Sequence, residues 1–318
     1  MSFTQFTIFT PTYNRAHTLS RVYKSLKSQT YHNFEWLIID DGSTDETRKL
    51  IESYQRDSSF PIIYNYQNNE GKYKAYNKAL SLARGELMIT LDSDDALHPD
   101  TLTKFSLSWD TLSSIEKKIV GGVIALCRNS DTGKIIGEEL ISDAERSLHL
   151  SLPSALEYQL KRKLYIDKCV AQRVDMLKDF PFPENKHVQF IPEALIGNRI
   201  SKEHQFLILN EPLKDVYYQS NGYSKNIIYS YINDADGRYL YHLSTINEIG
   251  VIVLRYDPIR FAKDIIQTFR MGFHADIPLL TTFQSLDTFI LKGCSPAAAI
   301  IGYLLSFLDR ITLRNETR

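Results

Sequence analysis

Cysteine is scarce in this chain of 318 residues, and neither sign of charge dominates. Cys127, Cys169 and Cys294 lie far apart with no C-x-x-C pair, which predicts reduced thiols in a cytosolic protein. The 37 lysines and arginines are balanced by 38 aspartates and glutamates, which argues against a dedicated nucleic-acid-binding protein. With 43% apolar and 24% charged residues, the composition excludes disordered and fibrous classes.

Long hydrophobic runs are also missing. The N-terminus has no basic segment followed by an apolar one, so the sequence predicts no signal peptide. The longest nearly apolar run, at 297–308, has 12 residues, whereas a spanning helix needs about 20. We therefore expect a cytoplasmic chain that does not cross a membrane.

The first half of the chain alternates β-rich runs with helical patterns. Strands separated by helices of this length form βαβ units in a parallel sheet. The S-x-x-E sequence at 43–46 predicts a capping box at the start of the second helix. The expected strands are 6–10, 34–39, 62–66 and 87–91, and the third helix is expected at 72–83.

Beyond residue 119 the alternation loosens. From about 226 onward the pattern is helical, so we expect a catalytic domain at 1–225 and a helical region at 226–318. Between residue 119 and this boundary we expect a strand at 119–126, a hairpin turn at 131–134, a helical or irregular segment at 143–163, and a strand pair at 166–174 and 206–209.

Acidic residues follow the fourth predicted strand. In extended backbone, Asp92 and Asp94 project to the same side, where two carboxylates suit Mg²⁺ or Mn²⁺ beside a substrate phosphate. The alternative is a solvated acidic turn that caps the next helix. We expect Asp95 to face the other way and to be structural.

Polar residues also follow the first two strands. Asp41 suits a ribose or base contact, with an Asx turn as the alternative, and Asp40 is expected to make the turn. Pro11 stiffens the first loop and Tyr13 offers a face for base stacking. Arg15 suits a phosphate or an ion pair with the neighbouring acidic loops, two interpretations that the sequence leaves open.

Lys72 stands at the start of the third predicted helix, which continues through Asn77. A helix N-terminus favours anions, so Lys72 is a candidate phosphate contact. The alternative is a solvated lysine after a glycine-containing turn.

Four sequence blocks, in order over residues 4–105, resemble family-2 glycosyltransferases. The resemblance implies a GT-A fold, that is, a Rossmann-like, mostly parallel sheet flanked by helices. It also implies a nucleotide-sugar donor, usually a divalent cation, and inversion at the anomeric carbon. The blocks are P-T-Y-N-R at 11–15, W-L-I-I-D-D-G-S-T-D at 36–45, N-x-G…A-x-N…A-x-G-E at 69–86, and L-D-S-D-D at 91–95.

Carried onto this chain, the resemblance assigns Asp41 to the nucleoside and Asp94 to the metal. It places Asp92 on the metal or the ribose. The full set expected to bind the nucleotide sugar is Thr10, Pro11, Thr12, Tyr13, Arg15, Asp41, Lys72, Asn77, Asp92 and Ser93.

Inverting transfer also needs a base for the acceptor hydroxyl. The family usually supplies it from a Glu-Asp pair at the start of a helix, and no such pair stands in the expected window. Aligned through the following helix, Glu193 takes the position of that aspartate, with Pro192 before it. The alternative is that Glu193 complements the helix dipole, and Glu184 is the reserve candidate.

Apolar residues recur at helical spacing over 297–311, flanked by Lys292, Arg310 and Arg314. Such a stripe docks on anionic lipid at the inner face of the cytoplasmic membrane, or packs on its own domain or a second subunit of a homo-oligomer.

Together these features predict a metal-dependent inverting glycosyltransferase that uses Mn²⁺ or Mg²⁺. The expected donor is a UDP-hexose, and the expected acceptor is a hydroxyl of a glycan or lipid-linked oligosaccharide in bacterial surface polysaccharide synthesis. The alternatives are a nucleotidyltransferase, which usually has a glycine-rich loop where 11–15 has no glycine, and a non-catalytic nucleotide-sugar-binding protein.

Overall fold

The chain forms two compact units in the computed structural model, which describes residues 4–136, 154–163, 167–185, 188–218 and 231–316. The first unit comprises Met1–Phe182 and Glu203–Tyr218, and the second comprises Pro183–Lys202 and Gln219–Arg318. The chain therefore leaves the first unit and returns to it. The expected domain boundary at residue 225 lies outside the described residues and stays a prediction.

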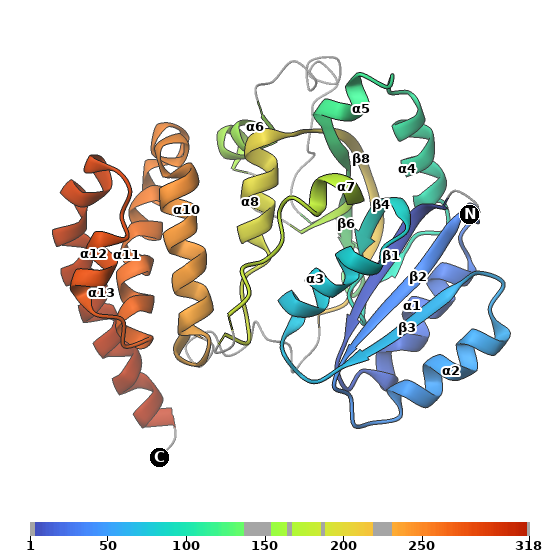
Figure 1. Cartoon of the computed structure of the whole chain (residues 1–318), viewed down its shortest axis with the longest axis horizontal. Helices are drawn as coiled ribbons and strands as arrows, with labels where there is room; N and C mark the ends of the chain where they lie inside the picture. The colour runs from blue at the N-terminus through green and yellow to red at the C-terminus, as the bar shows by residue number, and fades with distance from the viewer. Residues whose placement is uncertain (1–3, 137–153, 164–166, 186–187, 219–230, 317–318) are drawn as a thin grey trace. The chain divides into compact units, whose positions relative to one another are not determined.

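Within the described residues, the first unit is built on one mixed eight-stranded sheet, in the order β3-β2-β1-β4-β7-β6-β8-β5 (Figure 1). Strand β1 pairs in parallel with β2 and β4, and β2 with β3. Beyond β4 the pairing changes, because β7 is antiparallel to both β4 and β6. The strands are β1 (Thr4–Thr12), β2 (Phe34–Asp41), β3 (Ile62–Gln67), β4 (Gly85–Thr90), β5 (Ala96–Leu97), β6 (Val120–Asn129), β7 (Lys168–Arg173) and β8 (Gln205–Val216).

The α/β architecture confirms the fold expected from the sequence, with one difference in strand pairing. Strands β7 and β8 do not pair with each other, since β6 lies between them and runs parallel to β8. The turn expected at 131–134 is present, with Gly133 at φ 67° and its N–H donating to the Asn129 carbonyl at 2.9 Å. Of the segment 143–163, only residues from 154 onward are described, and they include α6 (Ala155–Arg162).

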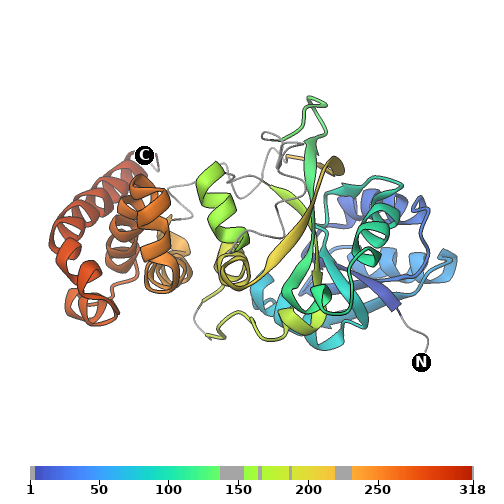
Figure 2. The ribbon, with the colours of Figure 1, turned by 90° about the horizontal axis from the view of Figure 1, so that it is seen from above.

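Helices cover both faces of the parallel half of the sheet, which explains why its two central strands, β1 and β2, are buried almost throughout. All eight residues of β2 are buried. Phe6 and Ile8 of β1 pack in the same core as residues of α1 and α4, whereas Phe9 contacts Tyr76 of α3 on the opposite face (Figure 2). The helices are α1 (Ala16–Lys27), α2 (Thr47–Asp57), α3 (Lys72–Leu82), α4 (Thr101–Asp110), α5 (Glu116–Ile119) and α7 (Val174–Leu177).

The capping box predicted at 43–46 was wrong, although α2 begins at the expected place. The Thr47 N–H donates to the Asp45 carboxylate at 3.0 Å. The Ser43 hydroxyl instead accepts from the Asn14 N–H at 2.8 Å. Asn14 adopts φ 52°, a left-handed conformation that asparagine tolerates, so Ser43 stabilises the loop after β1 rather than the helix.

The second unit is helical, as expected. Helix α11 packs between α10 and α13, and Asp309 of α13 accepts from Arg270 Nε of α11 at 2.8 Å. His274 Nε2 lies 2.8 Å from the same carboxylate, so a buried ionic cluster joins α11 to α13. The described helices with residues in this unit are α8 (Ala194–Glu203), α10 (Ala235–Tyr256), α11 (Pro258–His274), α12 (Leu279–Gln284) and α13 (Phe289–Glu316).

Helix α13 is longer than the apolar run in the sequence suggests. It is 28 residues long and, within the described residues, it alone meets the length and composition of a membrane-spanning helix. The qualifying stretch, Phe289–Leu313, has a mean hydropathy of 1.5, and a third of its most apolar window is buried.

Candidate active site

The predicted polar residues gather at one edge of the sheet, where parallel strands β1, β2 and β4 end. Asp41 is the last residue of β2, and Asp92 follows β4 by two residues. The turn itself is closed by a hydrogen bond from the Asp95 N–H to the Asp92 carbonyl at 3.1 Å. Open α/β sheets bind their ligands at this edge.

Two basic side chains face the acidic turn. Lys72 Nζ lies 2.6 Å from Asp92 Oδ1, and Arg15 Nη1 lies 4.0 Å from Asp94 Oδ2. The Asp92 side chain is 43% exposed and that of Asp94 is 19% exposed. Both cations thus contact the acidic turn in the structure, and a phosphate contact of either stays a prediction.

The environments of the two carboxylates differ. Desolvation alone would raise the pKa of Asp92. The positive charges of Lys72 and Lys214 have the larger combined effect, and they hold this pKa below its usual value. Burial, followed by the negative charge of Asp92, raises the pKa of Asp94. Asp94 is therefore the carboxylate that gains most from an added positive charge.

Strand β8 holds the turn from behind. Lys214 Nζ lies 3.4 Å from Asp95 Oδ2, and the Tyr217 N–H donates to Asp95 Oδ1 at 3.2 Å. Burial raises the pKa of Asp95 to about 6. Arg21 donates to the Asp94 carbonyl and stacks 3.6 Å from the centre of the Tyr217 ring. The burial and contacts of Asp95 agree with the structural role expected for it.

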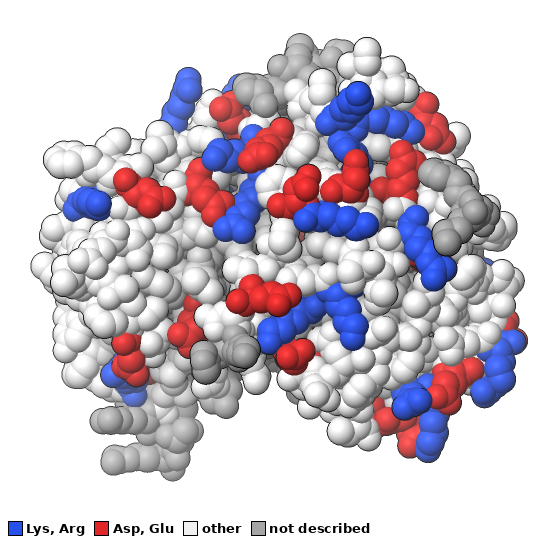
Figure 3. Space-filling model, in the orientation of Figure 1, with Lys and Arg blue, Asp and Glu red and all other residues white. Residues whose placement is uncertain are grey.

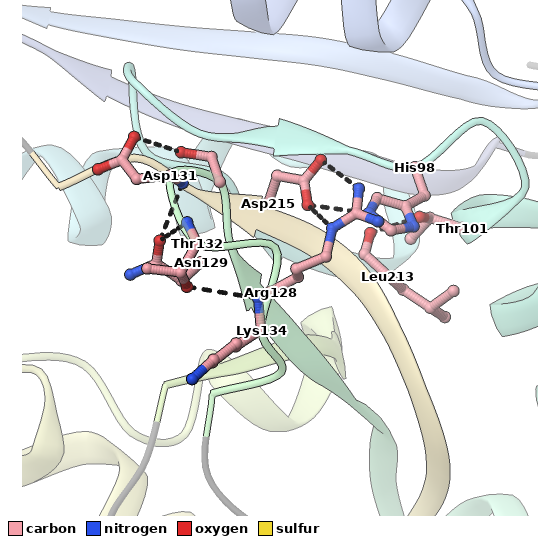
Figure 4. A network of polar contacts seen from close by, with 10 residues as sticks. His98, Thr101, Arg128, Asn129, Asp131, Thr132, Lys134, Leu213 and Asp215 are labelled. Carbon is pink, nitrogen blue, oxygen red and sulfur yellow. Dashed lines mark hydrogen bonds and ion pairs between the residues drawn. The ribbon is translucent and has the colours of Figure 1, made fainter.

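A second network ties β8 to its neighbours (Figure 4). Arg128 of β6 donates to both carboxylate oxygens of Asp215, at 2.7 and 3.0 Å. His98 Nε2 lies 3.1 Å from the same carboxylate, and the Thr101 hydroxyl donates to the Leu213 carbonyl at 2.6 Å. Sequence reasoning missed these residues and Lys214, because only strand pairing brings them together and no local motif marks them.

Asp41 is enclosed by the loop between β3 and α3. Its Oδ1 accepts from Gln67 Nε2 at 2.8 Å and from the Glu70 N–H at 2.9 Å, while Oδ2 accepts from the Gly71 N–H at 2.9 Å. Asp40 makes the expected turn, since its Oδ1 accepts from the Ser43 N–H at 2.8 Å. A role for Asp41 toward the nucleoside stays a prediction.

The loop after β1 offers one exposed aromatic face. Tyr13 is 48% exposed, as base stacking requires, whereas Pro11 is buried. The Thr10 hydroxyl accepts from Trp36 Nε1 at 2.9 Å, so this side chain orders the core. The buried Thr12 hydroxyl has no hydrogen-bond partner among the residues that the structure describes.

Asn77 is held by hydrogen bonds to the backbone of Phe182, and Ser93 is buried. Asn77 Nδ2 donates to the Phe182 carbonyl and its Oδ1 accepts from the Phe182 N–H, both at 2.9 Å. Ser93 is 7% exposed, between the two candidate metal ligands. Contacts of either residue with a donor stay predictions.

The candidate base belongs to the second unit. Glu193 precedes α8, and its carbonyl accepts from the N–H groups of Ile196 and Gly197 at 3.1 and 3.2 Å. The reserve candidate, Glu184, lies in the same unit. The assignment of Glu193 as base stays a prediction.

The carboxylate oxygens of Asp92 and Asp94 suit a divalent cation that is also bound by the substrate. Within the described ranges there is no group of three or more His, Cys, Asp or Glu that could hold a metal. Asp92 and Asp94 supply hard oxygen atoms, and each already faces a positive group. Mg²⁺ and Mn²⁺ commonly take one or two carboxylates and complete their coordination with water and phosphate, so the two residues fit.

Residues 7–179 match the sequence model of glycosyl transferase family 2, which covers more than half of the chain. The chain belongs to this family. The match contains most of β1, all of β4 and the acidic turn, and the chain has the GT-A fold.

Curated relatives match over about a third of the chain. The putative teichuronic acid biosynthesis glycosyltransferase TuaG of Bacillus subtilis is 36% identical over 98 residues, 30% of this chain and 38% of its own length. The poly(ribitol-phosphate) β-N-acetylglucosaminyltransferase TarS of Staphylococcus aureus is 33% identical over 100 residues, which are 31% of this chain and 18% of the length of TarS. The chain thus spans well under two thirds of these relatives.

Solved structures match the fold over nearly the whole chain. Residues 1–349 of S. aureus TarS align with a TM-score of 0.59 at 17% identity, covering 94% of this chain and 89% of that one. The mannosyltransferase PcManGT of Pyrobaculum calidifontis, in complex with GDP-Man and Mn²⁺, aligns with a TM-score of 0.57 at 16% identity, covering 97% and 88%. At this identity the similarity concerns the fold alone.

Proposed function

We propose that the protein is an inverting glycosyltransferase that moves a hexose-type sugar from a UDP-sugar to a hydroxyl group. The observation that carries this proposal is the acidic turn, where Asp92 and Asp94 project beside Lys72 and Arg15 within the family 2 domain. This cluster combines anionic groups for a cation with cationic groups for a diphosphate, as a nucleotide-sugar donor requires.

In this proposal the donor lies along the edge formed by β1, β2 and β4. The exposed ring of Tyr13 stacks on the base, and Asp41 contacts the nucleoside. Lys72 and Arg15 bind the diphosphate oxygens. Asp92 and Asp94 would hold Mn²⁺ or Mg²⁺, which when bound supplies positive charge that stabilises the leaving diphosphate.

The acceptor side needs a base. We assign this role to Glu193, which takes the proton of the acceptor hydroxyl as that oxygen attacks the anomeric carbon from the face opposite the diphosphate. The hydroxyl oxygen forms the new glycosidic bond, and the bond from the anomeric carbon to the diphosphate breaks with inversion.

The choice of UDP and of a surface glycan acceptor draws support from the relatives. TarS is named a poly(ribitol-phosphate) β-N-acetylglucosaminyltransferase, and one of its structures is in complex with UDP-GlcNAc. TuaG is named for teichuronic acid biosynthesis. A glycan or lipid-linked acceptor in bacterial surface polysaccharide synthesis follows by analogy.

A panel of nucleotide sugars tests the proposal by thermal stabilisation with and without Mn²⁺. A donor present at about 100 times its dissociation constant should add about 2.7 kcal/mol to the free energy of unfolding. We expect UDP-sugars to stabilise in the presence of Mn²⁺ and GDP-sugars or ATP to have little effect. Stabilisation by a nucleoside triphosphate, with pyrophosphate as the product, would instead identify a nucleotidyltransferase.

We further propose that α13 brings the protein to the inner face of the cytoplasmic membrane. The exposed residues over 293–308 include no charge, and the surface over α12 and α13 is mostly uncharged in the view of Figure 3. Lys292 and Arg310 stand exposed at the two ends, whereas the acidic Asp309 is buried in its ion pairs. The exposed apolar side chains are Ile300, Ile301, Tyr303, Leu304, Phe307 and Leu308.

Apolar residues between two basic ends suit a helix that lies in an anionic lipid surface. A second copy of the same helix fits less well, because parallel or antiparallel pairing brings basic ends together. Cosedimentation should therefore increase with phosphatidylglycerol content, and Leu304→Glu should reduce it. A dimer in sedimentation velocity, with no binding to vesicles, would contradict the proposal.

A further inference from the structure

Of the ion pairs that the structure describes at the acidic turn, the shortest joins Asp92 to Lys72, which the proposed metal would have to replace. Lys72 Nζ lies 2.6 Å from Asp92 Oδ1, within the range of a charge-assisted hydrogen bond. Both side chains are partly exposed, at 37% and 43%, so solvent and ligands reach the pair. Arg15 is farther from its partner, at 4.0 Å from Asp94.

A divalent cation on Asp92 would meet the Lys72 ammonium group at close range. The two positive charges repel each other, and Oδ1 cannot offer the same lone pair to both. Lys72 is thus a competitor of the metal for Asp92. A diphosphate offers the ammonium group a different partner, because its oxygens accept from ammonium groups as a carboxylate does.

The backbone of Lys72 is fixed while its side chain can move. Lys72 is the first residue of α3, and Gly71 before it adopts φ 99° and donates its N–H to Asp41 at 2.9 Å. A lysine side chain has a flexible four-carbon stem. Its ammonium group can therefore change partners near Asp41 and Asp92 without a change in the fold.

We propose that Lys72 is a built-in counter-ion that occupies Asp92 until the donor diphosphate draws it away. This inference rests on the proposed function, since it takes Asp92 as a metal ligand and a diphosphate as the donor group. Metal and donor then bind with positive coupling, and by linkage each strengthens the binding of the other equally. Lys72 weakens metal binding before the donor arrives and strengthens donor binding afterwards.

A Mn²⁺ titration followed by electron paramagnetic resonance tests the inference without any turnover. The proteins are the wild type, Lys72→Gln, Lys72→Arg and Lys78→Gln, each with and without saturating UDP. Lys78 is a matched control, because it lies on the same helix and donates to the Tyr66 carbonyl instead of to the acidic turn. Melting temperatures check that every variant is folded.

We expect Lys72→Gln to bind Mn²⁺ about three- to tenfold more tightly than the wild type in the absence of UDP, the range for losing one partly exposed opposing charge. The same variant should bind UDP about tenfold more weakly in the presence of Mn²⁺, so the two effects have opposite signs. Lys72→Arg, which keeps the charge, and Lys78→Gln should remain close to the wild type.

Two results would overturn the inference in distinguishable ways. Equal or weaker Mn²⁺ binding by Lys72→Gln, with measurable binding by the wild type, contradicts the counter-ion role and leaves the proposed function standing. An absence of Mn²⁺ binding in both proteins, even with UDP, overturns the metal site and the inference together.

Discussion

The ammonium group of Lys214 lies 3.4 Å from the carboxylate of Asp95, and both side chains are nearly inaccessible to solvent. Breaking a buried ion pair leaves one charge without a partner and costs about 3–5 kcal/mol. We therefore expect Lys214→Met to lower the free energy of unfolding by about this amount at pH 7.5. The double variant with Asp95→Asn should recover much of the loss, as measured by urea denaturation, and strictly additive losses would contradict the pairing.

The raised pKa of Asp95, about 6 in the folded chain against a usual 3.8, predicts a pH dependence of stability. Between pH 4 and pH 6 the folded chain keeps a proton that the unfolded chain has released. The contribution of Asp95 to stability therefore decreases as the pH rises through this window. The stability of the wild type minus that of Asp95→Asn should decrease from pH 4 to pH 6, and an increase would show that the carboxyl has an ordinary or lowered pKa.

Asp94→Asn should abolish sugar transfer and leave the fold intact. The substitution removes one of the two carboxylates proposed to hold the cation, and it also removes repulsion from Asp92. The melting temperature should stay within about 2 °C of the wild type, because Asp94 is partly exposed and near a like charge. Normal turnover in Mn²⁺ would exclude Asp94 from the site.

Asp41→Ala should weaken the binding of free UDP as well as that of the donor, since the proposed contact is to the nucleoside. It should also lower stability, because the Gln67 amide and the N–H groups of Glu70 and Gly71 lose their acceptor. Asp45→Ala is the matched control. It removes a carboxylate that binds the N–H groups of Ala16 and Thr47 in the same region, so it should lower stability and leave UDP affinity unchanged in calorimetry. An unchanged UDP affinity in Asp41→Ala would refute the nucleoside role.

Glu193→Gln should separate general-base catalysis from helix stabilisation. Loss of a general base reduces turnover by about 10²–10⁴-fold, whereas donor binding should barely change because the base acts on the acceptor. A residue that only complements the helix dipole would instead lower the melting temperature and leave the turnover of the folded enzyme intact. Turnover number and melting temperature of the one variant therefore decide the assignment, and the second pattern would redirect attention to Glu184.

The parallel half of the sheet could be predicted from the sequence because its signals are local. Each strand there contains a short apolar run that is followed by polar residues, and the alternation of strands and helices places Asp41 and Asp92 at the same edge of the sheet. The capping box failed because Ser43 has a competing partner, the Asn14 N–H, that lies 29 positions away in the sequence. Local patterns carry no information about such a partner.

Long-range pairing explains the remaining omissions. Lys214 follows Asp95 by 119 positions, and only the pairing of β5 with β8 brings the two residues together. Arg128 and Asp215 meet for the same reason, through the pairing of β6 with β8. The length of α13 was also missed, because a count of consecutive apolar residues starts only after Ser295 and Pro296 and stops at Asp309, which is charged but buried against α11.

The return of the chain to the sheet at Glu203 has a consequence for synthesis on the ribosome and for the choice of shorter fragments. Strand β8 pairs with both β6 and β5, yet it is made only after the excursion through residues 183–202. The first unit cannot complete its sheet during translation until that excursion has emerged, because β5 and one edge of β6 have no partner strand before then. A fragment ending at Phe182 would expose those strand edges and aggregate, whereas a fragment ending after Tyr218 would retain all the strands that the structure describes.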